Sequence, residues 1–137
     1  PNVVLTFGPD GVTGHPDHRA VSRWVGRAVA DRGDRIPLVT TATASAWHDE
    51  AIDRLHSIEA FWPGFPQPID DGVVVRLDAD LVDRKLAAIA RHASQMGRVH
   101  DALGPHHLRR VAGVECYAAA NPAASHHLSP ELELIAA

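Results

Sequence analysis

The residue types best suited to catalysis or metal binding lie in one short stretch, Gly14-His15-Pro16-Asp17-His18. His15 and His18 are three positions apart at the start of a predicted helix, so both imidazole rings can point toward the same cleft. Neutral imidazole is a good zinc ligand, and a catalytic zinc ion usually has three protein ligands and an open position for water. Two histidines do not complete such a site. A helix cap flanked by surface histidines explains the same spacing.

A strand and a helix must position this stretch. Residues 3–7 are apolar and rich in β-branched side chains, which predicts a strand covered on both faces, as in parallel sheets. Residues 8–11, Gly-Pro-Asp-Gly, are typical of a turn. A helix is predicted over residues 16–32, because proline suits the first helical turn and apolar residues recur every three or four positions. Ligand sites in open α/β sheets collect at the carboxyl ends of strands, so the loop between these two elements is the expected site.

The rest of the chain is predicted to continue the alternation of strands and helices. Ser45 and Asp80 are predicted helix caps, and Trp24 and Trp47 are predicted core anchors. Such alternation favours an α/β fold, Rossmann-like and layered, with a mainly parallel sheet. The predicted strands cover residues 36–42, 73–77 and 114–118, and the predicted helices cover residues 45–60, 80–96 and 106–110.

The segment from Phe61 to Pro68 breaks the helical pattern, because three prolines fall within it. Its aromatic side chains would be costly to leave in water, which predicts an ordered loop. This loop is expected either to form a rim over the site or to pack under another part of the protein.

Composition excludes several classes of function. The 137 residues have the length of one domain, assigned to residues 1–137. A net charge of -4 and a pI of about 6.2 give no broad attraction for nucleic acid or anionic lipid. Cys116 is the single cysteine, which excludes an intramolecular disulfide and a cysteine-based zinc site. No apolar run approaches the roughly 20 residues that span a bilayer, and without a basic leader segment a cytoplasmic location is expected.

The segment from Leu5 to Ser22, LTFGPDGVTGHPDHRAVS, closely resembles the second conserved block of LmbE/PIG-L de-N-acetylases. A looser similarity covers residues 85–95, which resemble the helical H-x-S-Q segment of that family, and extends to residues 113–117. Members of the family remove acetyl groups from N-acetylglucosaminyl compounds. The resemblance therefore implies a hydrolase that acts on a small amino-sugar conjugate, or, as a close variant, an amidase acting on a thiol conjugate of the same sugar.

The resemblance also implies roles for individual residues. His18 would be a metal ligand, and His15 would stabilise the tetrahedral oxyanion and protonate the departing amine. Asp17 would orient a neighbouring histidine, in keeping with the general role of carboxylates beside metal-binding imidazoles. The implied metal ion is Zn²⁺, although iron or cobalt would suit the same donor types.

One block of the family pattern is missing. The family's other metal ligands and its general base come from an A-H-P-D-D-E block near the amino terminus, and His-Pro occurs here only at His15-Pro16. The chain thus resembles a carboxy-terminal half that lacks the family's amino-terminal strands and helices. We expect that missing half, or self-association, to complete the sheet. The alternative is a non-catalytic binding or regulatory module, or an inactive fragment.

Three further residues are candidates for substrate binding. Asp10 could contact substrate hydroxyl groups, although an aspartate followed by glycine is already explained by a turn. Arg19 could bind a polar or anionic group, or lie solvated in the first helical turn. His92 could reach the cleft, or anchor its helix to the sheet through a polar contact.

Overall fold

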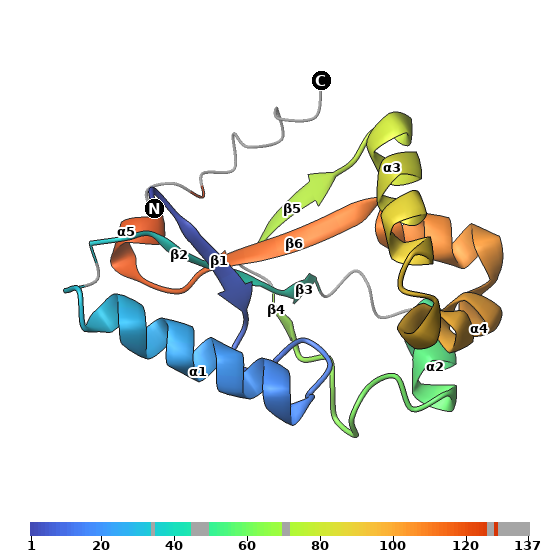
Figure 1. Ribbon diagram of the computed structural model, residues 1–137, viewed down its shortest axis with the longest axis horizontal. Helices are drawn as coiled ribbons and strands as arrows, with labels where there is room; N and C mark the ends of the chain where they lie inside the picture. Colours follow the sequence, from blue (N-terminus) through green and yellow to red (C-terminus); the bar gives the residue numbers. More distant parts are fainter. Residues whose placement is uncertain (34, 45–49, 70–71, 126–127, 129–137) are drawn as a thin grey trace.

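The computed structural model describes residues 1–33, 35–44, 50–69, 72–125 and 128. Four strands form one sheet, and a long helix lies beside its first strand, whereas the other long helices gather at the opposite end (Figure 1). This arrangement confirms the predicted α/β class. The strand order is β1 (Val4–Phe7), β2 (Leu38–Thr41), β6 (Val114–Ala119) and β5 (Val73–Arg76), and the helices are α1 (Pro16–Ala30), α2 (Glu50–Ser57), α3 (Ala79–Ala90) and α4 (Ala93–Ala112).

The prediction of a mainly parallel sheet is corrected by the strand pairing. β1 and β2 are parallel, but β6 is antiparallel to both of its neighbours. The cause is the pair of helices, α3 and α4, that joins β5 to β6. These helices pack against each other and return the chain to the point where β5 ended, so that the Leu77 N–H donates to the Gly113 carbonyl at 2.9 Å. β6 then runs back along β5, whereas a single crossover helix would have produced a parallel strand.

The predicted helix over residues 80–96 is in fact two helices, α3 and the start of α4. Asp78, not Asp80, caps α3, since its carboxylate accepts the Leu81 N–H at 2.8 Å. Apolar residues continue at helical spacing across the break after Ala90, so periodicity alone does not reveal it. α4 is itself kinked at Gly104, and the segment that follows the kink contains the predicted helix over residues 106–110.

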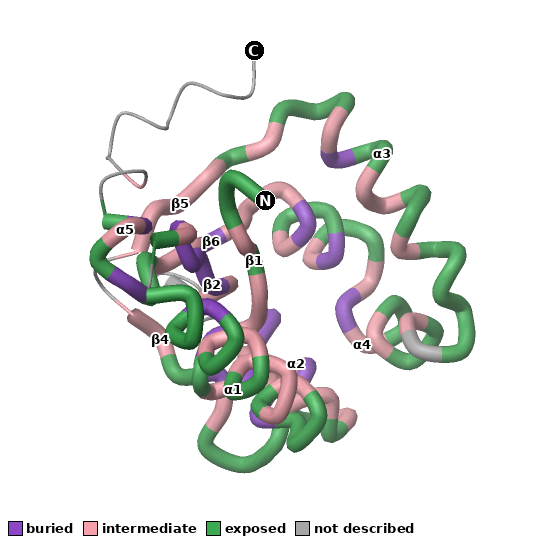
Figure 2. Tube along the Cα trace, turned by 60° about the vertical axis from the view of Figure 1, so that its left-hand side comes forward, coloured by how far each residue is buried: buried purple, intermediate pink, exposed green. Residues whose placement is uncertain are grey.

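The core cluster lies between α2 and α4 and consists of Ala51, Leu55, Leu103 and Leu108. Figure 2 shows buried stretches along both helices. Trp24 does not belong to the core, because 70% of it is exposed. On α1, Trp24 lies about 140° around the helix from the buried Val29, on the side that faces away from the sheet. The predicted cap Ser45 and the predicted anchor Trp47 lie outside the described residues.

Two short parallel strands, β3 (Thr43–Ala44) and β4 (Pro68–Ile69), and a terminal turn of helix, α5 (Pro122–Ser125), complete the fold. Asn121, just before α5, accepts the Leu38 N–H at 3.1 Å and donates to the Ile36 carbonyl at 2.9 Å, which fixes the start of β2. Within the described ranges, no helix has both the length and the apolar character needed to cross a membrane.

Candidate active site

The loop from Gly8 to His15 connects the carboxyl end of β1 to α1, in the predicted position for a site. Its backbone turns through left-handed conformations at Gly11, Val12 and Gly14, with φ of 71°, 62° and 79°. A left-handed valine is unusual, because its β-branched side chain crowds the backbone. The Asp10 carboxylate accepts the Val12 N–H at 3.1 Å and helps to hold this conformation. Asp10 therefore has a structural task in the turn.

His18 is held in one orientation by contacts on two sides. Its ring stacks on Phe7 with 4.2 Å between centroids and 4° between planes. Its Nδ1 lies 3.1 Å from the Gly11 carbonyl oxygen and 3.3 Å from the Thr13 hydroxyl. A carbonyl oxygen can only accept, so the neutral ring carries its proton on Nδ1 and leaves the lone pair on Nε2. Nε2 is therefore the atom of His18 that can bind a metal ion.

His15 is held in the opposite tautomer. It is the residue that caps α1, and its Nδ1 accepts the Asp17 N–H at 3.2 Å. The neutral ring must then carry its proton on Nε2, which makes Nε2–H a hydrogen-bond donor. The His15 and His18 rings lie 5.2 Å apart, and the His15 side chain is 47% exposed. The pair thus combines a nitrogen that can bind a metal ion with an N–H that can donate to a developing negative charge.

Asp17 lies at the exposed start of α1, with 87% of its side chain accessible. Its Oδ2 is 3.9 Å from His15 Nδ1, a separation that supports only a weak, solvent-screened interaction. The backbone N–H of Asp17 is closer to the His15 ring than its carboxylate is. The main chain of Asp17 therefore orients His15 more directly than the charge does.

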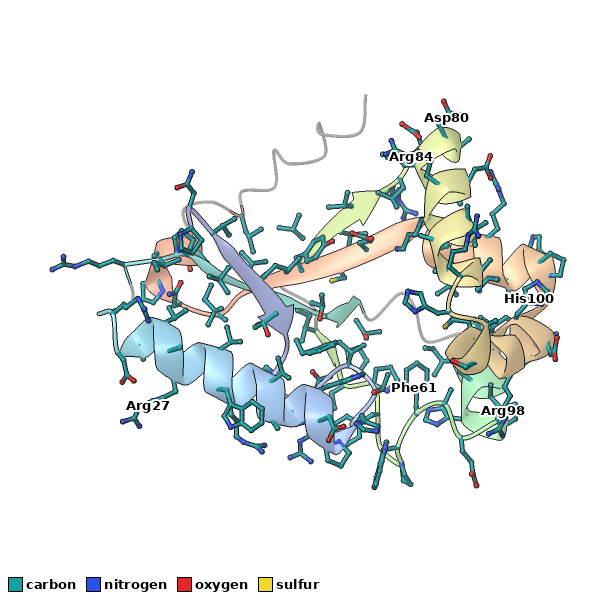
Figure 3. The ribbon with its side chains drawn as sticks, viewed as in Figure 1. Arg27, Phe61, Asp80, Arg84, Arg98 and His100 are labelled. Atoms are coloured by element: carbon teal, nitrogen blue, oxygen red, sulfur yellow. The ribbon has the colours of Figure 1, made fainter. Side chains whose placement is uncertain are left out.

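The aromatic loop, residues 61–68, packs against the site loop. The Trp62 N–H donates to the Thr13 carbonyl at 2.9 Å, and the Trp62 ring meets His15 edge to face at 6.4 Å. Phe65 fills the space beside Gly14, where an added Cβ would approach the phenyl ring to 2.3 Å. Phe61 packs against the core cluster (Figure 3). The loop thus contacts the site loop through Trp62 and Phe65 and packs against another part of the protein through Phe61, so each of the two predicted placements holds in part.

The structure places the other candidate residues differently. The Arg19 guanidinium is exposed and lies 6.0 Å from the centre of the Phe65 ring, close to the two histidines in the chain. His92 is exposed at the start of α4, at the junction with α3, and not on the site loop. One region therefore contains Asp10, His15, Asp17, His18 and Arg19. His92 lies elsewhere, at the junction of α3 and α4.

A polar cluster lies where α3 meets β6, at the sheet. Glu115 accepts from Lys85 Nζ at 2.8 Å and from the Tyr117 hydroxyl. Strand register aligns Phe7 with Thr41 and Thr41 with Tyr117, which places Tyr117 on the same face as Phe7, about 10 Å away. Glu115 and Tyr117 are two positions apart on one strand, and this period-two spacing is the signal that could have found the pair.

In this cluster the pKa of Glu115 is lowered and the pKa of Tyr117 is raised. Burial acts to raise the pKa of Glu115, but the hydrogen bonds from Lys85 and Tyr117 and the charge of Lys85 outweigh it, so the pKa lies below the ordinary 4.5. Burial, together with the adjacent Glu115 carboxylate, raises the pKa of Tyr117 well above its usual range. Glu115 is therefore held as a carboxylate and Tyr117 as a neutral phenol.

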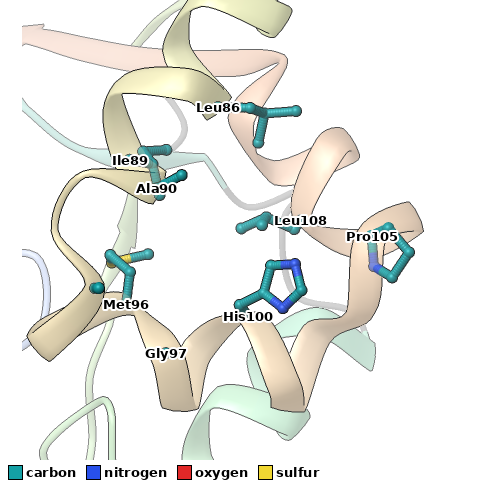
Figure 4. Close-up of a pocket in the computed structure, with 9 residues that line it drawn as sticks. Leu86, Ile89, Ala90, Met96, Gly97, His100, Pro105 and Leu108 are labelled. Atoms are coloured by element: carbon teal, nitrogen blue, oxygen red, sulfur yellow. The ribbon is translucent and has the colours of Figure 1, made fainter.

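A separate cavity of about 360 Å³ lies between α3 and α4 (Figure 4). His100 is the one titratable side chain among the nine that line it, and most of the others are aliphatic. This cavity does not bring together the acid, base and electrophilic groups that amide hydrolysis requires. The histidine loop, which is the segment from Gly8 to His18, remains the better candidate for catalysis.

The chain is similar to several deacetylases of known name. It is 32% identical over 113 residues to a 1D-myo-inositol 2-acetamido-2-deoxy-alpha-D-glucopyranoside deacetylase of Rhodococcus opacus, and 32% identical over 107 residues to the protein of the same name from Gordonia bronchialis. The similarity covers 70% of this chain in each case. The chain is thus a partial homologue of these deacetylases. The resemblance drawn from the sequence is thereby confirmed.

The chain spans 38–39% of the length of these relatives. A comparison with family models finds no match, and no solved structure is significantly similar to the chain. The family assignment therefore rests on the named relatives and on the residues that carry the resemblance.

The side chains at this site include donors for only part of a metal site. The tautomer of His18 leaves Nε2 unprotonated, as a metal ligand must be. Across the described residues, no group of three histidine, cysteine, aspartate or glutamate side chains is close enough to hold a metal ion. The described part of the chain thus offers a ligand and an oriented neighbouring histidine, but not the three ligands typical of catalytic zinc.

Proposed function

We propose that this chain forms part of the active site of an enzyme that removes the acetyl group from an N-acetylglucosaminyl conjugate, such as the inositol glycoside named for its relatives. The observation that carries the proposal is the opposite tautomers of His15 and His18, each fixed by a backbone group. Amide hydrolysis needs a hydrogen-bond donor aimed at the developing oxyanion and a proton for the departing amine. The Nε2–H of neutral His15 can meet the first need, and the proton that a general base takes from the attacking water can meet the second.

His18 is the proposed ligand for Zn²⁺ or another divalent transition metal ion. Bound there, the ion would lower the pKa of a coordinated water molecule and polarise the acetamido carbonyl. Its remaining ligands and the general base would come from outside the described residues, consistent with the fraction of the relatives' length that the chain spans. The stacked Phe7 ring and the Gly11 carbonyl keep His18 from rotating away.

In the reaction, water adds to the acetamido carbonyl and the C–N bond breaks, which releases acetate and a free amine. His15 donates a hydrogen bond through Nε2–H to the oxygen on which charge develops, and the proton that the general base takes from the attacking water passes to the leaving nitrogen. The exposed half of its ring faces solvent, from which a substrate would approach. Arg19 and Asp10 would contact polar groups of the conjugate, and His92, on a different part of the fold, would do so only through a longer substrate.

Substitution of the two histidines tests the proposal in the protein that contains these residues. His15→Ala removes the oxyanion donor, so turnover should fall at least about 100-fold while metal content stays nearly unchanged. His18→Ala removes a ligand, so metal content itself should fall. Turnover of the glycoside and metal content by atomic absorption are the two measurements.

His100→Ala is the matched control, because this exposed histidine lies on α4, away from the site loop, and should change neither quantity. An equal loss of metal in the His15 and His18 variants would contradict the division of roles. A non-catalytic binding or regulatory module is the second candidate, favoured by the incomplete ligand set among the described residues. That reading predicts no metal-dependent release of acetate by the parent protein.

A further inference from the structure

Trp62 combines a fixed backbone with a half-exposed side chain. Its N–H donates to the Thr13 carbonyl at 2.9 Å, and its own carbonyl accepts the Phe65 N–H at 3.0 Å. Residues on both sides are held, since Phe61 packs against the core cluster and Phe65 against Gly14. Nevertheless 49% of Trp62 remains accessible. Leaving a large aromatic side chain in water is unfavourable, so a preorganised, exposed indole beside a site suggests a ligand that covers it.

The indole is placed next to the proposed oxyanion donor. Its ring centroid lies 6.4 Å from that of His15, with 88° between the two planes. One ring therefore presents its edge to the face of the other, and they do not stack on each other. A molecule that covers Trp62 would have its border beside the His15 ring.

A pyranose ring has the shape and chemistry to occupy this position. One of its faces is formed by C–H groups with a partial positive charge, whereas the face of an indole carries partial negative charge. In an N-acetylglucosaminyl group the acetamido substituent projects from the edge of the ring. A sugar ring stacked on Trp62 would therefore extend its acetamido group toward His15.

We propose that Trp62 is the sugar-binding platform of this site and selects substrates whose acetamido group is attached to a pyranose ring. This inference rests on the proposed function. It adds a residue outside the histidine loop that determines specificity. Trp24 is more exposed, at 70%, but it lies on the outer side of α1 and has no part in this surface.

The test is the binding of methyl N-acetyl-α-D-glucosaminide to the protein that contains these residues, together with the steady-state kinetics of deacetylation. Trp62→Ala and Trp62→Leu should each weaken binding about tenfold and raise KM to the same extent, with kcat changed less than about threefold. Trp62→Phe retains an aromatic face and should restore most of the affinity. Trp24→Ala is the matched control and should bind as the parent protein does.

The leucine variant separates stacking from simple apolar contact, because it keeps bulk without a π face. Equal binding by the Trp62→Leu and Trp62→Phe proteins would overturn the proposal, as would unchanged binding in Trp62→Ala or no measurable binding by the parent protein. Each variant keeps the Trp62 backbone bond to Thr13, and circular dichroism checks the fold.

The binding measurement also distinguishes this inference from the proposed function. Binding that depends on Trp62 in a protein without deacetylase activity would support the platform and refute the proposed reaction. Deacetylation with a KM that is independent of Trp62 would support the reaction and refute the platform.

Discussion

At the scale of single residues, the backbone group that each histidine contacts determines what its other ring nitrogen can do. The Gly11 carbonyl requires a proton on His18 Nδ1, and the Asp17 N–H requires a lone pair on His15 Nδ1. The two rings are only 5.2 Å apart, yet the neutral side chains present an acceptor and a donor, respectively, at Nε2. Main-chain groups therefore assign the proposed roles without a buried carboxylate.

Gly14 should be irreplaceable in this loop. Its φ is 79°, and a Cβ would approach the Phe65 ring to 2.3 Å, so Gly14→Ala adds both backbone strain and a clash. We expect the free energy of unfolding to fall by about 1–3 kcal/mol, with displacement of Phe65 from the loop. Urea denaturation provides the measurement.

Gly26→Ala is the control for that substitution. Gly26 lies within α1, and an added Cβ would meet no atom within 4 Å, so alanine should stabilise the protein by about 0.5–1 kcal/mol through helix propensity. Similar stability of the Gly14→Ala protein and the parent would mean that Phe65 does not press on this loop.

At the scale of elements, the Lys85–Glu115–Tyr117 cluster fastens α3 to the sheet. Lys85 lies on α3 and the other two residues on β6, and about 30% of the Lys85 and Glu115 side chains remains exposed. The cluster belongs to the sheet face that also carries Phe7. It therefore links the helical pair to the same layer of the protein that supports His18.

The titration of Tyr117 can be measured directly, because it is the single tyrosine of the chain. Its pKa is raised by burial and by the Glu115 carboxylate, so phenolate absorbance should appear only well above pH 10.0. Glu115→Gln removes the negative charge and should lower the midpoint, although burial should still keep it above 10.0. Ultraviolet difference spectroscopy as a function of pH provides the measurement.

The sign of the associated stability change follows from the raised pKa. The contribution of Tyr117 to stability is fully present below pH 10.0 and is lost as the pH rises through the folded-state pKa. Asp53→Asn, a charge removal at an exposed position on α2, should leave the titration unchanged. A Tyr117 midpoint near 10.0 in the parent protein would show that this cluster is open to solvent.

At the scale of the whole molecule, no strand among the described residues pairs with the outer side of β1. β1 and β5 are the two edge strands, and at β1 the exposed fractions of Leu5 and of the preceding Val3 are 54% and 52%. An exposed, apolar edge strand is prone to pair with another strand. We therefore expect either another part of the protein or a second copy of the chain to cover this edge.

Leu5→Lys tests that expectation. A charge on the edge strand should oppose strand pairing, so it should shift the isolated chain toward the monomer in sedimentation experiments. Ala30→Lys, at an exposed position on α1, adds the same single positive charge and controls for a simple change in net charge. An unchanged mass distribution in the Leu5→Lys chain would exclude β1 as the associating edge.

The sequence predicted the local elements well, because local signals specify them. The runs at residues 3–7, 73–77 and 114–118 form strands, and Pro16 begins α1. Two predictions were wrong: the helix cap at Asp80, and a single helix over residues 80–96. Helical periodicity continues after Ala90 although the chain changes direction there. The sequence also misplaced Trp24, since the apolar residues of α1 are spread around more than one side of the helix.

The sequence by itself determined the residue types at the candidate site, the α/β class and the relationship to de-N-acetylases. Tertiary structure decided the direction of β6, the tautomers of His15 and His18, and the approach of Trp62 to the site. The physical reason is the separation along the chain of the groups that interact. Element type follows from neighbours a few positions apart, whereas strand direction and ring orientation depend on groups that only the folded chain brings together.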